Sequence, residues 1–340
     1  MSGACSNRRS RTLILALVWS GWAHAETTLS GAIDVYADWT RSPVGSLVRL
    51  DSNTFGNTSI RLRSTETLAA GTDLTLLCQT GLFADTGASN PNNPCYVAVA
   101  GRLGSGAIGE QYTPHAEVLC NADAFGSSFW GTPYAIFVSG LNYLIRPDAF
   151  SVDSRNAMGN RARVSAMFVP ARDGANGRLT SRGQEFLALH LKPTPDAYLG
   201  LVGVHDAGTA PNRHSVDTVL LATAWNLERW KLSAGAQSVR LRTRDLGTQR
   251  YRELTAGFKF HATSGDTLLV NAAVSDNRSL PGHRSWMIGG TWLVSLSRFT
   301  EIYIGLSRLT NAGGASLGFG QAVPGNSKSD DALLGLRKTF

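Results

Sequence analysis

Apolar and polar positions alternate with a period of two along most of this chain, in stretches of roughly ten residues. Residues 60–63, 239–244 and 301–309 show it most clearly, with apolar side chains on one face and arginines or other polar groups on the other. Successive side chains of a β-strand point to opposite faces, so this period is that of a strand. Helix-capping patterns followed by a 3.6-residue stripe are scarce. The pattern predicts an all-β chain.

The last strand of the chain ends on an aromatic residue, Phe340. Residues 332, 334, 336, 338 and 340 share one face of that strand, and the long side chain of Lys338 can reach a membrane interface. A soluble domain rarely needs its final residue to be a phenylalanine in a strand. In a transmembrane barrel the last strand must close on the first, because lipid cannot form hydrogen bonds with the backbone groups of an unpaired sheet edge. The terminus therefore favours an antiparallel transmembrane β-barrel.

Alternation alone also fits a soluble β-sandwich, in which apolar side chains face inward and polar ones outward. A membrane barrel reverses this order, with apolar side chains toward lipid and polar ones toward the lumen. Arginines recur in the middle of the predicted strands, as in residues 60–63. Together with the terminal Phe340, these arginines favour the barrel over the sandwich.

Short turns and longer polar loops alternate along the chain, as periplasmic turns and external loops do in such barrels. We expect short turns at residues 69–72, 103–106 and 263–266, and longer loops at 85–94, 207–215, 275–285 and 311–330. The count reaches sixteen strands, or fourteen without a weak hairpin around residues 178–182. The number must be even if both termini lie on the same side of the membrane.

Residues 112–156 break the rhythm, because no clean alternation runs through them. They contain Pro114, Pro133 and Pro147 and several aromatic residues. A connection this long is usually functional or disordered, and its aromatic content argues against disorder. We expect a functional loop here.

The amino terminus resembles a secretory signal peptide. Arg8, Arg9 and Arg11 form a basic region, residues 12–19 are apolar, and residues 23–25 read Ala-His-Ala, a typical cleavage site. A membrane anchor is the alternative, but the apolar run is too short to cross a bilayer. The expected organisation is a signal peptide over residues 1–25 and a barrel over 26–340, with a constriction loop at 112–156.

The amino-acid composition is compatible with an exported β-barrel. Only 17% of residues are charged, and 36 are glycine. The formal charge of +7 falls to +4 without the three signal-peptide arginines, which is too weak and dispersed to indicate nucleic-acid binding.

The cysteines leave two alternatives open. Cys78 and Cys95 flank one predicted loop on the same strand face, and they either form a disulfide or serve as two small apolar residues. Cys5 leaves with the signal peptide, and Cys120 is left over. No C-x-x-C motif or Cys/His cluster suggests a metal site.

Several segments resemble the general porins of β-proteobacteria. Residues 57–68, NTSIRLRSTETL, are similar to the second strand and first periplasmic turn of that family, typically S-R-x-G-x-R-G-x-E-D-L-G-G-G. Residues 79–87, 101–112 and 164–170 resemble later strands, and the closing GLRKTF resembles the family's G-L-R-H-x-F. The resemblance covers most of residues 26–170 and the last ten, while the middle fits only in strand rhythm.

The resemblance implies a homotrimer of sixteen-stranded barrels, each a water-filled channel. In the family, the third external loop folds inward to form an eyelet, and that loop corresponds to residues 112–156. Selectivity comes from an arginine-rich wall that faces carboxylates on the loop. Arg63 matches the family's arginine before the first turn. In the family, assembly machinery reads the terminal aromatic strand, which makes Phe340 the expected assembly signal.

The chain also departs from the family pattern. Ser59 and Glu110 stand where the family usually has arginines, and Thr67 replaces an aspartate. Asn93 and Pro94 occupy positions where basic residues are common. Arg61, in place of a glycine, restores one positive charge. The expected anion preference is therefore weak.

The predicted pore-lining residues are basic or polar on the strands and acidic around the long loop. They are Arg61, Arg63, Gln79, Glu110, Glu117, Asp123, Asp148 and Asp153. The arginines form a basic wall that attracts anions, or they only solvate the lumen; each acid faces that wall or is an ordinary loop acid. Arg240, Arg242 and Arg244 lie near an external strand end, where they bind lipopolysaccharide or line the vestibule.

Two patterns suggest enzymes but lack their context. Residues 104–109 match G-x-G-x-x-G, yet no helical stripe follows to place a helix N-terminus at a pyrophosphate. His214 and Ser215 could belong to a hydrolase triad, but no G-x-S-x-G elbow is present. We expect neither catalysis nor a cofactor.

The sequence thus predicts a trimeric outer-membrane channel, transporting ions and small hydrophilic solutes through its pore. Its expected partners are these solutes, outer-membrane lipid and lipopolysaccharide, and no nucleic acid. A substrate-specific channel is the alternative suggested by the aromatic loop, and a structural or adhesive barrel with partner-binding loops is another.

Overall fold

The computed structural model describes residues 25–68, 71–90, 93–126, 131–132, 135–138, 143–154, 161–172, 179–208, 213–245, 247–319 and 323–340. The predicted signal peptide, apart from Ala25, lies outside these residues. In the described part there is one α-helix, α1 (Pro114–Ala122), and the rest of the regular structure is strand. The strands are β1 (Ala25–Ser42), β2 (Gly45–Ser52), β3 (Ser59–Leu68), β4 (Thr72–Leu82), β5 (Ser89–Asn90), β6 (Cys95–Gly101), β7 (Gly104–Tyr112), β8 (Ile145–Asp153), β9 (Ala162–Arg172), β10 (Leu179–Leu191), β11 (Ala197–Asp206), β12 (Arg213–Leu227), β13 (Trp230–Thr243), β14 (Gly247–His261), β15 (Asp266–Asn277), β16 (Arg284–Ser297), β17 (Thr300–Ala312) and β18 (Lys328–Thr339).

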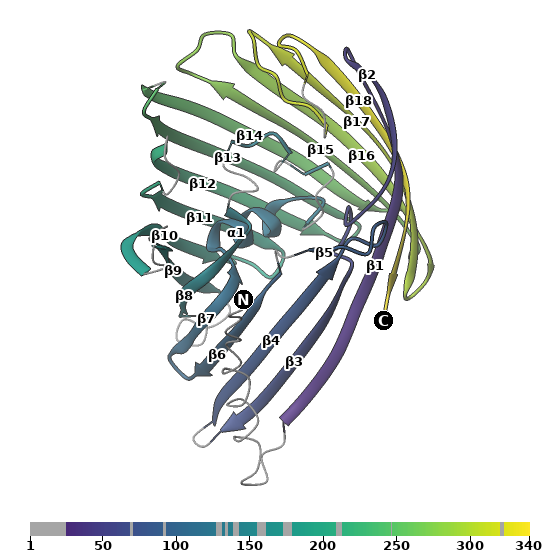
Figure 1. The fold of residues 1–340 in the computed structure, drawn as a ribbon. Coiled ribbons are helices and arrows are strands. Elements are labelled where there is room, and N and C mark those ends of the chain that lie inside the picture. Colours follow the sequence, from purple (N-terminus) through teal and green to yellow (C-terminus); the bar gives the residue numbers. More distant parts are fainter. Residues whose placement is uncertain are drawn as a thin grey trace, which may run out of the picture.

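These strands form one closed antiparallel ring (Figure 1). β18 pairs with β1, from Ala32 opposite Thr339 to Arg41 opposite Asp330, so the sheet has no free edge. β2 and β3 lie one after the other along the same side of β1, and β5 and β6 do so along β4. Each of these two pairs fills one strand position, so the eighteen strands make a sixteen-stranded barrel. The predicted barrel is confirmed, with a strand at the hairpin that looked weak, where β10 begins at Leu179.

The long loop is shorter than the sequence suggested. Residues 145–153 belong to β8, which pairs with β7 and β9, so the connection after β7 covers residues 113–144 rather than 112–156. The alternation of β8 is hidden because the register shifts between Gly109 and Gln111 of β7, and Asp148 has a left-handed φ of 55°. Such a bulge puts extra residues on one strand and disrupts the period of two.

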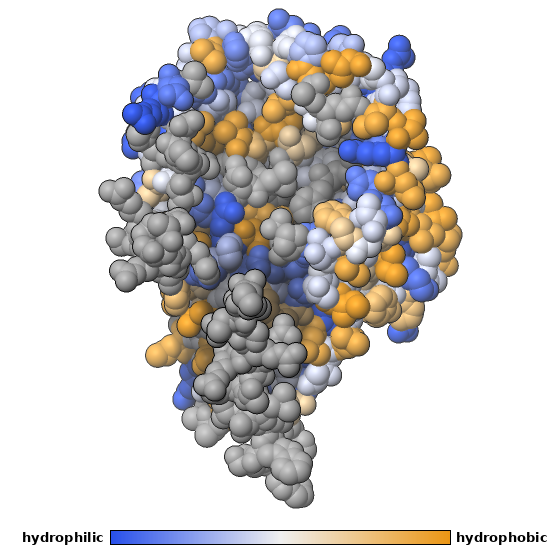
Figure 2. Space-filling view, viewed as in Figure 1, coloured by the Kyte–Doolittle hydropathy of each residue, from blue (hydrophilic) through white to orange (hydrophobic). Residues whose placement is uncertain are grey.

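The wall has two chemically different faces. On β17, Ile304 and Leu306 are exposed, while the alternate residues Tyr303 and Ser307 are buried. We call the face with exposed apolar residues the outer face and the opposite one the inner face. Figure 2 shows hydrophobic residues spread over the outer flank at the right of the view. An apolar exterior around a closed sheet is the order expected in lipid rather than in a soluble sandwich.

Cys78 and Cys95 form a disulfide, which decides between the two alternatives that the sequence left open. The two residues lie directly opposite each other on β4 and β6. They share the outer face with exposed Leu76 and Val97. The disulfide therefore joins neighbouring strands on the outside of the barrel, next to the break between β5 and β6.

The carboxyl terminus closes the ring through Gly31. The amide of Gly31 donates to the Phe340 carbonyl at 2.9 Å, and the amide of Phe340 donates back to Gly31 at 3.0 Å. A Cβ at position 31 would lie 2.4 Å from the Phe340 ring and 2.7 Å from the Ser59 carbonyl oxygen. The ring therefore occupies the space that a side chain at position 31 would take, and Phe340 stays 56% exposed on the outer face.

We expect deletion of Phe340 to lower the yield of folded, heat-modifiable barrel in outer membranes, because it removes this closing pair of hydrogen bonds and the interfacial ring. Gly31→Val should reduce the yield as well, since it displaces the ring while leaving the terminus intact. Thr339→Ser is the matched control near the same end. Wild-type yield in both test variants would show that the terminal residue does not guide closure.

Candidate functional site

Helix α1 begins directly after β7, where the chain turns away from the wall. Thr113 caps it: the Thr113 side chain accepts a hydrogen bond from the Ala116 amide at 3.1 Å, and Pro114 occupies the first turn. Both are favoured helix starts, because the cap satisfies a free amide and proline has none to lose. This helix is absent from the sequence prediction, although the Thr-Pro pair followed by Glu117 is its signal.

The buried side of α1 packs on the inner face of the wall. Val118 and Leu119 belong to one buried apolar cluster with Val202 of β11 and Leu220 of β12. Figure 1 shows α1 within the ring of strands. An apolar inner wall is unusual for a polar lumen, and here it is covered by the helix.

Hydrogen bonds connect the same segment to strands β13–β15. His115 Nε2 donates to Gln237 Oε1 at 2.6 Å, because that amide oxygen only accepts. The Val138 amide donates to Glu253 Oε1 at 2.7 Å, and Asn271 Nδ2 donates to the Gly131 carbonyl at 3.0 Å. The described parts of residues 113–144 are thus held along the inner face from β11 to β15.

Burial changes the protonation of two groups in this segment. It lowers the pKa of His115 to about 4, so the imidazole is neutral at neutral pH. It raises the pKa of Asp123 to about 7, against the opposing effect of hydrogen bonds and of Lys231. Lys231 Nζ donates to the backbone carbonyl of Asp123 at 2.9 Å. Asp123 is therefore a buried group at the end of α1, and only part of its population is charged near neutral pH.

A second segment, residues 53–58 between β2 and β3, also leaves the wall. Asp34 Oδ2 accepts hydrogen bonds from the Phe55 amide at 2.6 Å and the Gly56 amide at 2.9 Å, and Asp34 Oδ1 accepts one from Tyr303. Arg337 donates to the Phe55 carbonyl at 2.9 Å. This segment is absent from the sequence prediction, because its only signal is an interruption of the alternation by Asn-Thr-Phe-Gly-Asn-Thr.

The two segments meet through aromatic rings. The Phe55 ring lies 4.5 Å from that of Tyr303 on β17 and 6.2 Å from that of Phe125, which follows α1. All three rings belong to one buried cluster. Residues distant in sequence thus form one aromatic bridge against the inner face of β17.

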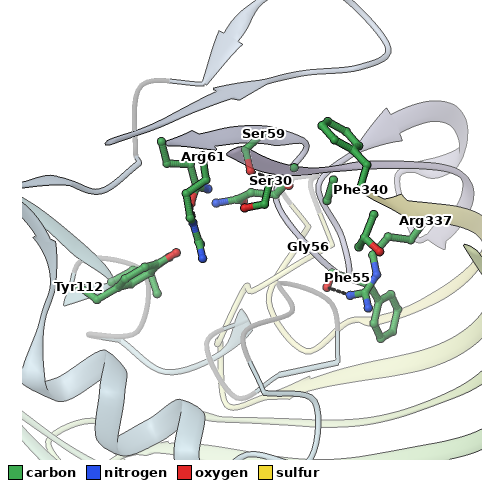
Figure 3. A pocket seen from close by; sticks show the side chains of 14 residues that line it. Ser30, Phe55, Gly56, Ser59, Arg61, Tyr112, Arg337 and Phe340 are labelled. Atoms are coloured by element: carbon green, nitrogen blue, oxygen red, sulfur yellow. Dashed lines mark hydrogen bonds between the residues drawn. The ribbon is translucent and has the colours of Figure 1, made fainter. Parts of the chain in front are cut away.

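A cavity of about 420 Å³ remains beside this bridge (Figure 3). Arg61, Arg337, Gln79, Ser59 and Tyr112 are among its lining residues. Figure 3 shows the Arg61 side chain extending toward Tyr112, with Arg337 beside Phe55 and Gly56. No Asp or Glu side chain is among the lining residues that the structure describes.

The two cavity arginines differ in their partners. Arg61 donates through Nε and Nη2 to the neutral Gln79 Oε1, at 2.9 and 2.7 Å, and Gln79 in turn donates to Asn93 at 2.9 Å. Arg337 instead forms an ion pair with Glu301, at 2.7 Å. Arg61 is thus the cavity's less compensated positive charge, and Arg63 lies two residues further along the same face.

The predicted acids do not converge on Arg61. Glu117 of α1 and Asp153 of β8 both pair with Arg163 of β9, at 2.5 and 2.8 Å. This charged cluster is not part of the cavity lining, and Arg163 is not among the pore-lining residues predicted from the sequence. Its signal was only the alternation of Arg161 and Arg163.

The register corrects the prediction that Glu110 lines the pore with Arg61. Leu62 pairs with Cys78, Cys78 with Cys95, and Cys95 with Glu110, so these four residues share the outer face. Arg61 pairs with Gln79 on the other face. Asp148, in the neighbouring bulge, is near enough to interact electrostatically with Glu110 and is not in the cavity lining.

In the described part of the chain, no helix is long and apolar enough to cross a membrane. No group of three or more His, Cys, Asp or Glu side chains in that part is placed to hold a metal ion.

Comparisons with known proteins agree with this geometry. Among solved structures, an anion-selective porin from Comamonas acidovorans is similar, with a TM-score of 0.80 at 17% identity over 93% of this chain and 100% of that one. The trimer form of Vibrio cholerae OmpT gives 0.69 at 9% identity over 93% and 99%, and Salmonella typhi OmpF in complex with daunomycin gives 0.65 at 11% over 92% and 97%.

At sequence identities this low, the similarity to these three structures shows a shared fold alone. A search of curated proteins finds no match. The family described as Gram-negative porin matches residues 12–316, which is most of the chain. The chain therefore belongs to the Gram-negative porin family and forms an outer-membrane diffusion channel.

Proposed function

We propose that this channel passes ions and small hydrophilic solutes with a weak preference for anions. The observation that carries the preference is Arg61, which faces the cavity with only a neutral amide as its partner. Fixed charges act strongly in a narrow, low-dielectric passage. The name of the similar Comamonas porin supports the sign of the preference. Reversal potentials in a salt gradient test it, as described in the Discussion.

Two features keep the proposed preference weak. Arg337 is paired with Glu301, and Arg163 is shared by Glu117 and Asp153. These pairs cancel much of the positive charge on the inner face. The net field at the constriction then depends mainly on Arg61 and Arg63.

The constriction itself is proposed to consist of residues 113–144 and 53–58. The first segment packs on the inner face of the wall through α1, and the second is held by hydrogen bonds to Asp34. Their contact through Phe55 and Phe125 supports a passage narrowed from two sides. In this arrangement the third external loop supplies most of the obstruction, and the shorter segment completes it.

A homotrimer is the proposed assembly, with β2–β7 facing the other subunits. The exposed outer-face residues of these strands include many aliphatic ones and no tryptophan, whereas β12–β16 expose four tryptophans. The aliphatic residues include Val48, Leu50, Ile60, Leu62, Val97, Val99 and Ile108, and the tryptophans are Trp225, Trp230, Trp286 and Trp292. Tryptophan marks surfaces in contact with the lipid interface, so the aliphatic side fits contact with protein. The trimer form named for the Vibrio cholerae relative supports this state.

We expect Val97→Trp to shift the protein from trimer to monomer on native gels, because a large ring overfills a close-packed subunit contact. Val219→Trp, on β12, is the matched control, since lipid accommodates the added ring. Both valines are about half exposed in the single chain, at 46% and 54%. Equal trimer fractions in the two variants would place the contact elsewhere.

A further inference from the structure

A chain of side-chain amides on the inner face holds the guanidinium of Arg61. Arg61 of β3 lies directly opposite Gln79 of β4. Gln79 Oε1 accepts hydrogen bonds from Nε and Nη2 of Arg61, at 2.9 and 2.7 Å. Gln79 Nε2 donates to Asn93 Oδ1 at 2.9 Å, and Asn93 Nδ2 donates to the Asn90 carbonyl at 2.7 Å. We call Gln79 and Asn93 the amide relay.

The two ends of this chain fix the orientation of both amides. A guanidinium only donates hydrogen bonds, and a backbone carbonyl only accepts them. Asn93 must therefore turn its Nδ2 toward Asn90, which leaves its Oδ1 for Gln79. Gln79 must in turn present its Nε2 to Asn93 and its Oε1 to Arg61. Because any other arrangement of the two amides leaves a clash of like groups, the relay has a single polarity.

The amide relay is buried in a site that is shaped for it. Gln79 is 8% exposed and Asn93 is 3% exposed. A Cβ at Gly81 of β4 would lie 2.3 Å from Asn93 Nδ2, so the glycine leaves the space that the Asn93 amide fills. Asn57, in the segment between β2 and β3, donates a longer hydrogen bond to Asn93 Oδ1, at 3.4 Å. Breaking any of these buried hydrogen bonds leaves a polar group without a partner, so the relay is held rigidly.

The backbone beside the amide relay is also fixed. The Gln79 amide donates to the Pro94 carbonyl at 2.9 Å. The disulfide joins Cys78, which precedes Gln79, to Cys95, which follows Pro94. The disulfide on the outer face and the amides on the inner face therefore hold β4 and the start of β6 together from opposite sides of the wall.

The amide relay engages only one edge of the Arg61 guanidinium. Nε and Nη2 face Gln79, and among the described residues no acceptor is found for Nη1. The side chain extends into the cavity toward Tyr112 (Figure 3). Both relay side chains are neutral, so they fix the position of the guanidinium without cancelling its charge. An arginine without such a partner samples many rotamers, and its charge is then spread over a wider part of the lumen.

We propose that Gln79 and Asn93 are positioning residues, which hold the Arg61 charge at the constriction and thereby maintain the ion preference. This inference rests on the proposed role of Arg61 in anion preference. Replacing a relay amide with leucine, a side chain of similar size, removes no charge from the channel. If only the number of charges matters, the ion preference stays the same. If the relay sets where the guanidinium lies, the preference falls although every charge is retained.

The test measures the reversal potential of the full-length barrel in a planar bilayer under a low-salt gradient. Asn93→Leu and Gln79→Leu should each move the potential toward cations, by less than Arg61→Ser does. Neither should move it further in the Arg61→Ser background, because two residues that act through one contact are not additive.

Asn277→Leu is the matched control. Asn277 is also buried on the inner face and donates to a neutral glutamine, Gln249, at 3.2 Å. Gln249 Oε1 accepts its other hydrogen bond from Tyr251 rather than from an arginine. The control should therefore leave the reversal potential at the wild-type value.

Three outcomes would contradict the positioning role. If Arg61→Ser shifts the potential and the relay variants do not, the relay does not position the charge, while the anion preference of Arg61 stands. Equal shifts of a relay variant with and without Arg61 would mean that it does not act through that arginine. No shift in Arg61→Ser would overturn both this inference and the proposed preference. Heat-modifiability shows that each barrel is folded, and either relay variant alone decides the question if the other does not fold.

Discussion

Replacing residues 121–143 with a short glycine linker is expected to raise the single-channel conductance several-fold. These residues include the end of α1 and the Phe125 ring that meets Phe55, so their removal eliminates the bridge across the interior. Conductance rises with the open cross-section of the narrowest part of the passage. Planar-bilayer recordings measure this directly, and exclusion of neutral polymers gives the change in radius.

A milder variant separates obstruction from folding. Phe55→Ala keeps the long loop but removes the contacts with Phe125 and Tyr303, and a smaller rise in conductance is expected. Heat-modifiability of both proteins serves as the folding control. If the shortened barrel folds and conducts as the wild type does, residues 121–143 do not narrow the pore.

Replacing both Arg61 and Arg63 with Ser is expected to move the reversal potential clearly toward cations. Arg61 faces the cavity with the neutral Gln79 as its partner, so its charge is compensated by no neighbouring acid in the lining described. The shift should shrink at high salt, because the Debye length falls from about 10 Å at 0.1 M to about 3 Å at 1 M. Reversal potentials in a salt gradient at both concentrations measure it.

Two further variants test where the acids lie, and the first of them serves as the control. Glu110→Gln should leave the reversal potential unchanged, because Glu110 lies on the outer face. Glu117→Gln should move it toward anions, because it removes one of the two acids that pair with Arg163. An unchanged potential in the double arginine variant at low salt would mean that Arg61 and Arg63 do not control ion passage.

The barrel could be predicted from sequence because its main determinants are local. The period of two sets which residues share a face, and it placed Arg61 and Arg63 together opposite Ile60 and Leu62. The terminal Phe340 predicted closure of the last strand on the first. Short-range turn chemistry set the strand count, although the turn expected at residues 103–106 lies at Arg102 and Leu103, because Gly104 already pairs with Gly101.

The same rule should have placed Glu110 correctly. It is two residues from exposed Ile108 and therefore on the outer face, but the family resemblance at that position outweighed the alternation. The end of the long loop was missed for a different reason. β8 contains a bulge and a left-handed Asp148, and both disturb the local pattern on which strand prediction depends.

The interior contacts could not be predicted from the sequence, because they join segments that are far apart along the chain. The sequence shows that Arg163 and Glu117 are charged, but it does not show that α1 brings the Glu117 carboxylate to 2.5 Å from the Arg163 guanidinium. The inward path of residues 53–58 depends on Asp34 and Tyr303, which come from other strands. Such contacts follow from the closure of the ring, since only closure places β1, β3 and β17 around one interior.

The most direct test of an open, weakly anion-preferring channel is the zero-current potential of the purified wild-type protein in a planar bilayer under a salt gradient. We expect stable, ohmic channels and a small potential of the sign that anion passage produces, decreasing as the salt concentration rises. A folded protein that inserts but does not conduct would contradict the channel, and a potential of the cation sign would contradict the role of Arg61.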